Sequence, residues 1–158
     1  MKTGCMLLTL MLGLAAVTRA GADSSSVPSG IAMSFAPKPG TLAQISVDQN
    51  LATVTLHIGP VSTVEAISVE AEQKIDVKVA DYNFDGYQDF SLSHIDDGMG
   101  TYQMYQIYVF SAVEQKFVRL QPSCGDDFIN VVLSTPAQRR LTHSYFSDST
   151  LKSCAKSY

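Results

Sequence analysis

Residues 75–92, IDVKVADYNFDGYQDFSL, contain the pattern that decides the fold. Apolar and polar side chains alternate in residues 75–80 and again from Phe90, and this period of two residues is typical of a β-strand. The segment between them, residues 81–89, is rich in Asp, Asn and Gly, which favour turns. The whole stretch therefore predicts two antiparallel strands joined by one tight loop, a β-hairpin.

The oxygen-bearing residues of this loop have the spacing of a calcium site. They stand at alternate positions, and Gly86 allows the sharp turn that a side chain would obstruct. Calcium takes six to eight oxygen ligands, and the pattern matches the first nine positions of an EF-hand loop. We expect one Ca²⁺ to be bound by side-chain oxygens and one backbone carbonyl, from Asp81, Asn83, Asp85, Tyr87 and Asp89.

The loop departs from an EF-hand sensor in its last positions. Position twelve is Leu92 instead of Glu, and strand patterns rather than long helices flank the loop. We therefore expect a structural ion that closes a β-hairpin, with metal binding linked to folding. The alternative interpretation is a hairpin turn rich in Asp and Asn that binds no metal.

Strand patterns continue along most of the chain. They occupy residues 42–47, 51–58, 102–110, 117–120, 128–133 and 141–146, whereas residues 64–69 fit a strand or a short helix. Residues 102–110 carry large apolar side chains on both faces, which predicts a central strand. No sustained helical period is present. We expect a mostly β protein of about eight strands, an antiparallel β-sandwich or small barrel-like sheet, in one domain of residues 41–158.

The first 22 residues have the three-part pattern of a signal peptide. Lys2 is followed by the uncharged apolar run 5–17 and by the small residues Ala20–Ala22. The alternative is a buried helix or an anchor, but the run is short for a membrane span. Residues 23–40 are rich in Ser, Pro and Gly and are expected to be a flexible leader. The mature protein is expected to be exported and to have no stable membrane anchor.

Export determines how the cysteines and the charge are interpreted. Cleavage leaves two cysteines, Cys124 and Cys154, and an oxidising compartment favours a disulfide between them over two free thiols. Cleavage also removes two of the 11 basic side chains and none of the 15 acidic ones, which leaves a net charge of −6. An acidic chain without Lys/Arg clusters argues against nucleic-acid binding.

Motifs of catalysis are absent from the sequence. It contains no Gly-x-Ser-x-Gly elbow, no His-x-x-x-His pair and no glycine-rich phosphate loop. The acidic neighbours Asp96 and Asp97 are expected to point apart on a strand end. His57, His94 and His143 are dispersed along the chain. We therefore expect a protein that is not an enzyme.

Residues 75–120 resemble a family of small exported bacterial proteins. The resemblance rests on the strand and Asp-rich loop of residues 77–90, the glycine loop Gly98–Thr101, the tyrosines Tyr102, Tyr105 and Tyr108, and the pair Lys116-Phe117. The family includes immunity proteins of the bacteria-killing type IV secretion system, which are similar in fold to periplasmic inhibitors of invertebrate-type lysozyme. The resemblance implies a periplasmic or secreted inhibitor whose partner is a lysozyme-like peptidoglycan hydrolase.

An inhibitor of this kind would place a loop in a sugar-binding cleft lined by catalytic carboxylates. A tyrosine hydroxyl could bond to those carboxylates, and Tyr102 and Tyr145 are the candidates. Each of them could instead be a strand residue that packs on the sheet. The alternative function is a calcium-stabilised periplasmic binding or scaffold module without inhibitory activity.

Overall fold

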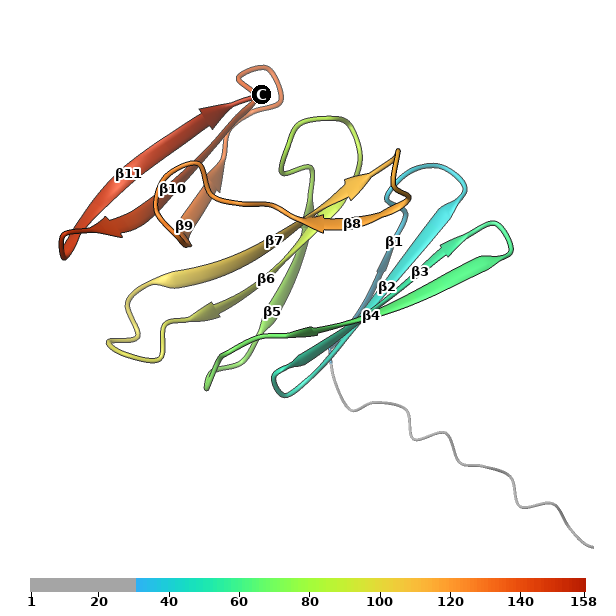
Figure 1. Cartoon of the computed structure of the whole chain (residues 1–158), viewed down its shortest axis with the longest axis horizontal. Coiled ribbons are helices and arrows are strands. Elements are labelled where there is room, and N and C mark those ends of the chain that lie inside the picture. The colour runs from blue at the N-terminus through green and yellow to red at the C-terminus, as the bar shows by residue number, and fades with distance from the viewer. Residues whose placement is uncertain (1–30) are drawn as a thin grey trace, which may run out of the picture.

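The computed structural model describes residues 31–158, in which all regular structure is β-strand and the strands form two antiparallel sheets (Figure 1). The first sheet has the order β1–β2–β3–β4, with bounds Ile31–Phe35, Thr41–Asp48, Leu51–Ile58 and Val61–Ser68. The second has the order β11–β10–β9–β7–β6–β5, with β8 also paired to β7. Its strands are β5 (Asp76–Ala80), β6 (Asp89–Ile95), β7 (Gln103–Ser111), β8 (Lys116–Arg119), β9 (Phe128–Leu133), β10 (Arg140–Ser147) and β11 (Thr150–Ser157). The predicted mostly β, antiparallel fold is confirmed.

The main core lies between the two sheets. The first sheet contributes small and branched side chains such as Ala43, Ile45 and Leu56, and the second contributes Phe90 and Phe110. Alternation along each strand explains this core, because every second side chain of β2 and β3 is buried.

A second, smaller core lies on the other face of the second sheet. It contains Tyr82, Ile107, Phe128 and Leu141. Strand β7 supplies Ile107 to this cluster and Phe110 to the main core, and it pairs with β6, β8 and β9. The central place predicted for residues 102–110 is therefore confirmed.

The predicted flexible leader, residues 23–40, is wrong for residues 31–35. Residues 31–35 form strand β1, which pairs with β2 from Ile31↔Val47 to Phe35↔Ala43. The apolar residues at positions 31, 33 and 35 have a strand period, but the run is short and adjoins a Pro- and Gly-rich break. The predicted signal peptide, residues 1–22, and residues 23–30 lie outside the described residues.

Two other segments show where tertiary pairing decides the structure. Residues 64–69, which fitted a strand or a helix, belong mostly to β4. The sequence of strand β11 is mostly polar and has no strand pattern. In the structure Cys154 is its only buried residue. The strand forms by pairing with β10 along its whole length, from Ser147↔Thr150 to Arg140↔Ser157. Within residues 31–158 there are eleven strands rather than about eight.

The two cysteines of the described chain form the predicted disulfide. Cys124 lies in the segment before β9 and Cys154 lies on β11, and their Sγ atoms are bonded. The bond ties the outer strand of the second sheet to the loop that precedes β9. No helix within residues 31–158 has the length and apolar character needed to cross a membrane.

Candidate metal loop and neighbouring surface loop

The Asp-rich loop closes the hairpin between β5 and β6, as predicted, with Ala80 paired to Asp89. Three of the five predicted ligands accept hydrogen bonds from backbone N–H groups within the loop itself. Asp81 Oδ1 and Asn83 Oδ1 both accept a hydrogen bond from the backbone N–H of Asp85, at 3.1 and 3.2 Å. Asp85 Oδ1 accepts from the N–H of Tyr87 at 2.8 Å. The loop therefore curls around its own acceptor oxygens.

Asp89 has a different role from the other loop carboxylates. It is completely buried, and its Oδ2 accepts from the N–H of Tyr82 while Oδ1 accepts from the N–H of Phe110, both at 2.8 Å. The pKa of Asp89 is raised to about 7, mainly by burial. The two hydrogen bonds from backbone N–H groups lower this pKa, whereas the charges of Asp85 and Asp81 raise it. Asp89 thus clamps the start of the loop to β7.

The aromatic residues of the loop attach it to the sheet. Tyr82 is buried in the smaller core, where its hydroxyl is 2.7 Å from Ser91 Oγ, and burial raises its pKa to about 12. Tyr87 packs edge-on against Phe110 of the main core. The loop is therefore anchored in both cores of the protein.

The donor atoms of the loop suit a hard cation. Within residues 31–158 no three His, Cys, Asp or Glu side chains lie together as a ready metal cluster. The predicted donors include an amide oxygen and a backbone carbonyl, however, and the Asp81 and Asn83 oxygens already meet at one backbone atom. Calcium prefers such oxygen donors. The residues fit a calcium ion, which stays a prediction.

A second Asp-anchored loop, residues 96–102, joins β6 to β7 and projects beyond the end of the sheet (Figure 1). The Asp96 carboxylate accepts hydrogen bonds from the N–H groups of Met99, Thr101 and Tyr102. The Asp96 N–H donates to the Tyr102 carbonyl at 2.8 Å. These backbone bonds, with that of Tyr102 the largest, lower the pKa of Asp96. One side chain therefore organises the whole loop.

Apolar side chains with exposed surface lie in this loop and on the strands beside it. Met99 is 76% exposed, and the Tyr102 ring packs edge-on against Phe146 of β10 with ring centres 5.6 Å apart. Phe146 is itself exposed and lies opposite Leu151 of β11. We call Met99, Tyr102, Phe146 and Leu151 the apolar collar. Large apolar groups gathered at the surface indicate a contact site for another molecule.

The two predicted inhibitory tyrosines lie in different surroundings. Tyr102 belongs to the projecting loop, whereas Tyr145 is half-buried on β10 beside the segment that holds the disulfide. A Cβ added at Gly125, whose φ is +68°, would lie 2.7 Å from the Tyr145 side chain. Tyr145 therefore fills the space beneath Gly125, which is a packing role.

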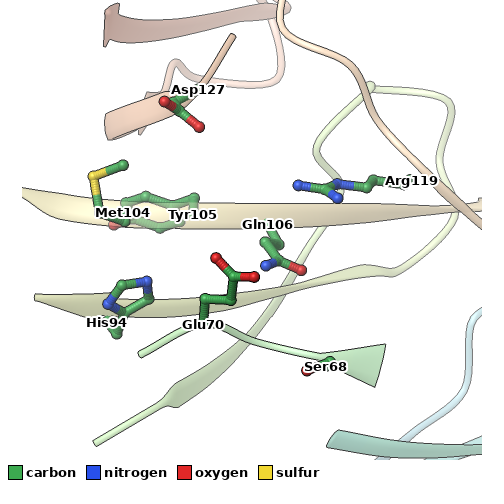
Figure 2. Close-up of a pocket in the computed structure, with 8 residues that line it drawn as sticks. All are labelled: Ser68, Glu70, His94, Met104, Tyr105, Gln106, Arg119 and Asp127. Carbon is green, nitrogen blue, oxygen red and sulfur yellow. The ribbon is translucent and has the colours of Figure 1, made fainter. Parts of the chain in front are cut away.

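A polar cleft with a volume of about 480 Å³ opens beside the C-terminal end of strand β4 (Figure 2). Its lining comes from the segments around β4, β6, β7, β8 and β9: Ser68, Glu70, His94, Met104, Tyr105, Gln106, Arg119 and Asp127. The ion pairs among the described residues are Lys74–Asp76 and Lys116–Glu114, so Arg119 is not held in one. No sequence pattern indicated this cleft, because its residues share no local motif.

The three histidines stay apart in the structure, on three different strands. His57 on β3 is hydrogen-bonded to Ser62 and Gln44, and His94 on β6 lines the cleft. His143 on β10 is buried and packs edge-on against Phe128. Each therefore has its own structural setting.

Comparison of the chain with models of protein families, with curated proteins and with solved structures gave no match.

Proposed function

We propose that this protein inhibits a lysozyme-like enzyme that cleaves peptidoglycan in the periplasm, and that loop 96–102 enters the sugar-binding cleft of that enzyme. The observation that carries the proposal is the construction of this loop, which projects from the sheet, is braced by Asp96 and exposes Met99. The target class follows from the resemblance of residues 75–120 to secretion-system immunity proteins and lysozyme inhibitors.

The bracing of the loop favours tight insertion. A loop that is already ordered loses little conformational entropy on binding. The Asp97 carboxylate accepts a hydrogen bond from the N–H of Glu72 at 2.9 Å, which turns it back towards the body of the protein. Gly98, Met99 and Gly100 are left as the leading edge, and their narrow profile suits a cleft built for sugar rings.

Apart from Met99 at the leading edge, the apolar collar provides the surface at the base of the inserted loop. Aromatic residues and methionine are enriched at the centres of protein interfaces, where they bury much area at low entropic cost. Tyr102 combines a ring packed on Phe146 with a hydroxyl that can reach a carboxylate of the target. Tyr102 is therefore the tyrosine that we assign to inhibition, and Tyr145 is assigned to packing.

Calcium enters the proposal as a structural ion at the Asp81–Asp89 loop. The charges of Asp85 and Asp81 raise the pKa of Asp89, so carboxylates repel one another in this hairpin. A divalent cation would offset that repulsion. Asp89 bonds to Phe110 of β7, and β7 begins at the projecting loop. Stiffening the hairpin would therefore support the strand that presents the inhibitory loop.

The test is a peptidoglycan lysis assay in which the purified protein is titrated into a panel of lysozyme types and any hydrolase encoded beside its gene, with calcium and with chelator. Met99→Glu is compared with Val113→Glu, a matched control at a 94% exposed valine in the turn at the other end of β7. We expect saturable inhibition by the wild type and the control, and inhibition at least about tenfold weaker for Met99→Glu, which is about 1.4 kcal/mol.

Two outcomes would contradict the proposal. Equal weakening by both substitutions would exclude the loop as the contact site. Lack of inhibition of every hydrolase, with a folded protein, would favour a calcium-stabilised binding or scaffold module instead.

A further inference from the structure

Strand β4 is an open edge of the first sheet. It pairs with β3 on one side, and seven of its eight residues are exposed, Val61 to 58% and Val64 to 69%. Its pairing with β3 runs without a register shift. Native proteins usually protect such edges with lysine, proline or a bulge. Strand β4 has none of these and carries a single charged residue, Glu65, whereas the end strand β11 of the second sheet carries Lys152 and Lys156.

One hydrogen bond establishes which backbone groups of β4 are free. Directly after the strand, the N–H of Val69 donates to the carbonyl of Asn50 at 2.8 Å. In an antiparallel pair the direction of the backbone groups alternates, so every second residue before Val69 faces β3. The intervening residues turn their N–H and C=O groups to the open side: Ser62, Val64, Ala66 and Ser68.

We propose that β4 pairs with β4 of a second copy of this chain, antiparallel about a two-fold axis that passes through Val64. The outward-facing residues allow a two-fold arrangement in which Val64 lies opposite its own counterpart. Ser62 then lies opposite Ala66 of the second copy, and Thr63 opposite its Glu65. The two first sheets become one continuous sheet.

The sequence of β4 favours this pairing register over the adjacent one, in which the axis passes through the next residue. Shifting the pairing so that the two-fold axis passes through Glu65 would place two carboxylates directly opposite each other, and like charges in that position are destabilising. With Val64 on the axis, a β-branched pair occupies the centre and each Glu65 meets a threonine hydroxyl. Pro60, which has no N–H to donate, limits the ladder at its end.

The partner is a second copy because the strand is complementary to itself. The only charged residue of β4 is Glu65, and the proposed register places it opposite a neutral side chain. The contact is made mainly by backbone hydrogen bonds over one strand, so its area is small and the dimer depends on protein concentration.

The test is oxidative cross-linking of single-cysteine variants. Val64→Cys on the axis places two cysteines at a Cα separation of about 5.5 Å, which a disulfide can bridge. The matched control is Val61→Cys, which is similarly exposed on the same strand but would lie roughly 20 Å from its counterpart. Both variants carry Cys5→Ser, so the introduced thiol is the only one outside the Cys124–Cys154 disulfide.

We expect a covalent dimer from Val64→Cys and at least tenfold less from Val61→Cys. Equal cross-linking of the two variants would overturn the register. As a second measurement, sedimentation equilibrium of the wild type should show a concentration-dependent dimer, and Val64→Lys should weaken it at least tenfold because two ammonium groups would meet on the axis. A wild type that stays monomeric at all concentrations would overturn the proposal.

Discussion

The two Asp-anchored loops of the second sheet use the same chemistry in opposite surroundings. Asp89 and Asp96 each accept hydrogen bonds from backbone N–H groups and so fix a turn. Asp89 is completely buried and its pKa is raised to about 7, mainly because burial disfavours the charge. Asp96 lies near the surface and its pKa is lowered, because the N–H groups, that of Tyr102 first, stabilise its charge by more than its partial desolvation opposes it.

Because the two aspartates differ in burial, we expect them to contribute differently to global stability and to the shape of the surface loop. The Asp89 clamp joins segments far apart in the sequence, at Tyr82 and Phe110, so its loss would disturb both the hairpin loop and its attachment to β7. The Asp96 bonds stay within residues 96–102, so its loss would loosen one loop. A buried clamp therefore governs global stability, whereas an exposed one governs the shape of a surface loop.

The largest expected effect comes from Asp89→Ala. It leaves two buried N–H groups without acceptors, and we expect the free energy of unfolding to fall by about 3–4 kcal/mol. Asp89→Asn retains one carbonyl acceptor and should lose about half as much. Urea unfolding in the presence of a chelator measures the free energy of unfolding of both variants without any contribution from calcium. An unchanged unfolding midpoint for Asp89→Ala would contradict the assignment of Asp89 as a clamp.

Calcium is expected to act on the first loop and not on the second. At a free concentration about 100 times its Kd, calcium should raise the free energy of unfolding by about 2.7 kcal/mol. Asp85→Ala should abolish this response, whereas Asp96→Ala should retain it. Thermal melting with calcium and with chelator measures the difference. Equal melting temperatures of the wild type in both conditions would exclude the calcium site.

The sequence predicted those parts of the fold that depend on neighbouring residues. Strand alternation on either side of an Asp- and Gly-rich turn was enough for the β5–β6 hairpin. The Cys124–Cys154 disulfide was predicted because the expected cleavage of residues 1–22 leaves two cysteines. Strands β1 and β11 were missed, because one is short and adjoins prolines and the other is mostly polar. Both form through their partner strands.

The same limit applies to the candidate sites. The spacing of Asp81, Asn83 and Asp85 predicted a curled loop, but the bond from Phe110 to Asp89 spans 21 positions and no local pattern indicates it. Asp96 was considered only as half of an acidic pair. Its place before Gly98 and Gly100 is the turn signal that could have identified it as a loop-bracing residue.

Asp96→Ala is expected to affect recognition more than stability. The N–H groups that donate hydrogen bonds to Asp96 are near the surface and can bond to water instead, so the free energy of unfolding should change little. Inhibition of the target hydrolase should weaken about tenfold, because the loop must then be ordered on binding. Asp96→Asn, which retains one acceptor, should lie between. Paired unfolding and lysis assays separate the two effects, and a large loss of stability would contradict the local role.

The smallest expected effect is a change of loop order in acid. Backbone hydrogen bonds lower the pKa of Asp96 below its ordinary value of 3.8, so the folded loop binds a proton less readily than the unfolded chain. Its contribution to loop order is therefore complete above pH 3.8 and is lost as the pH falls through the lowered pKa. The amide chemical shifts of Met99, Thr101 and Tyr102 should report this transition with a midpoint below 3.8. A midpoint at or above 3.8 would show that the carboxylate does not hold those N–H groups in solution, and the loop would then lose the rigidity on which its insertion into a cleft depends.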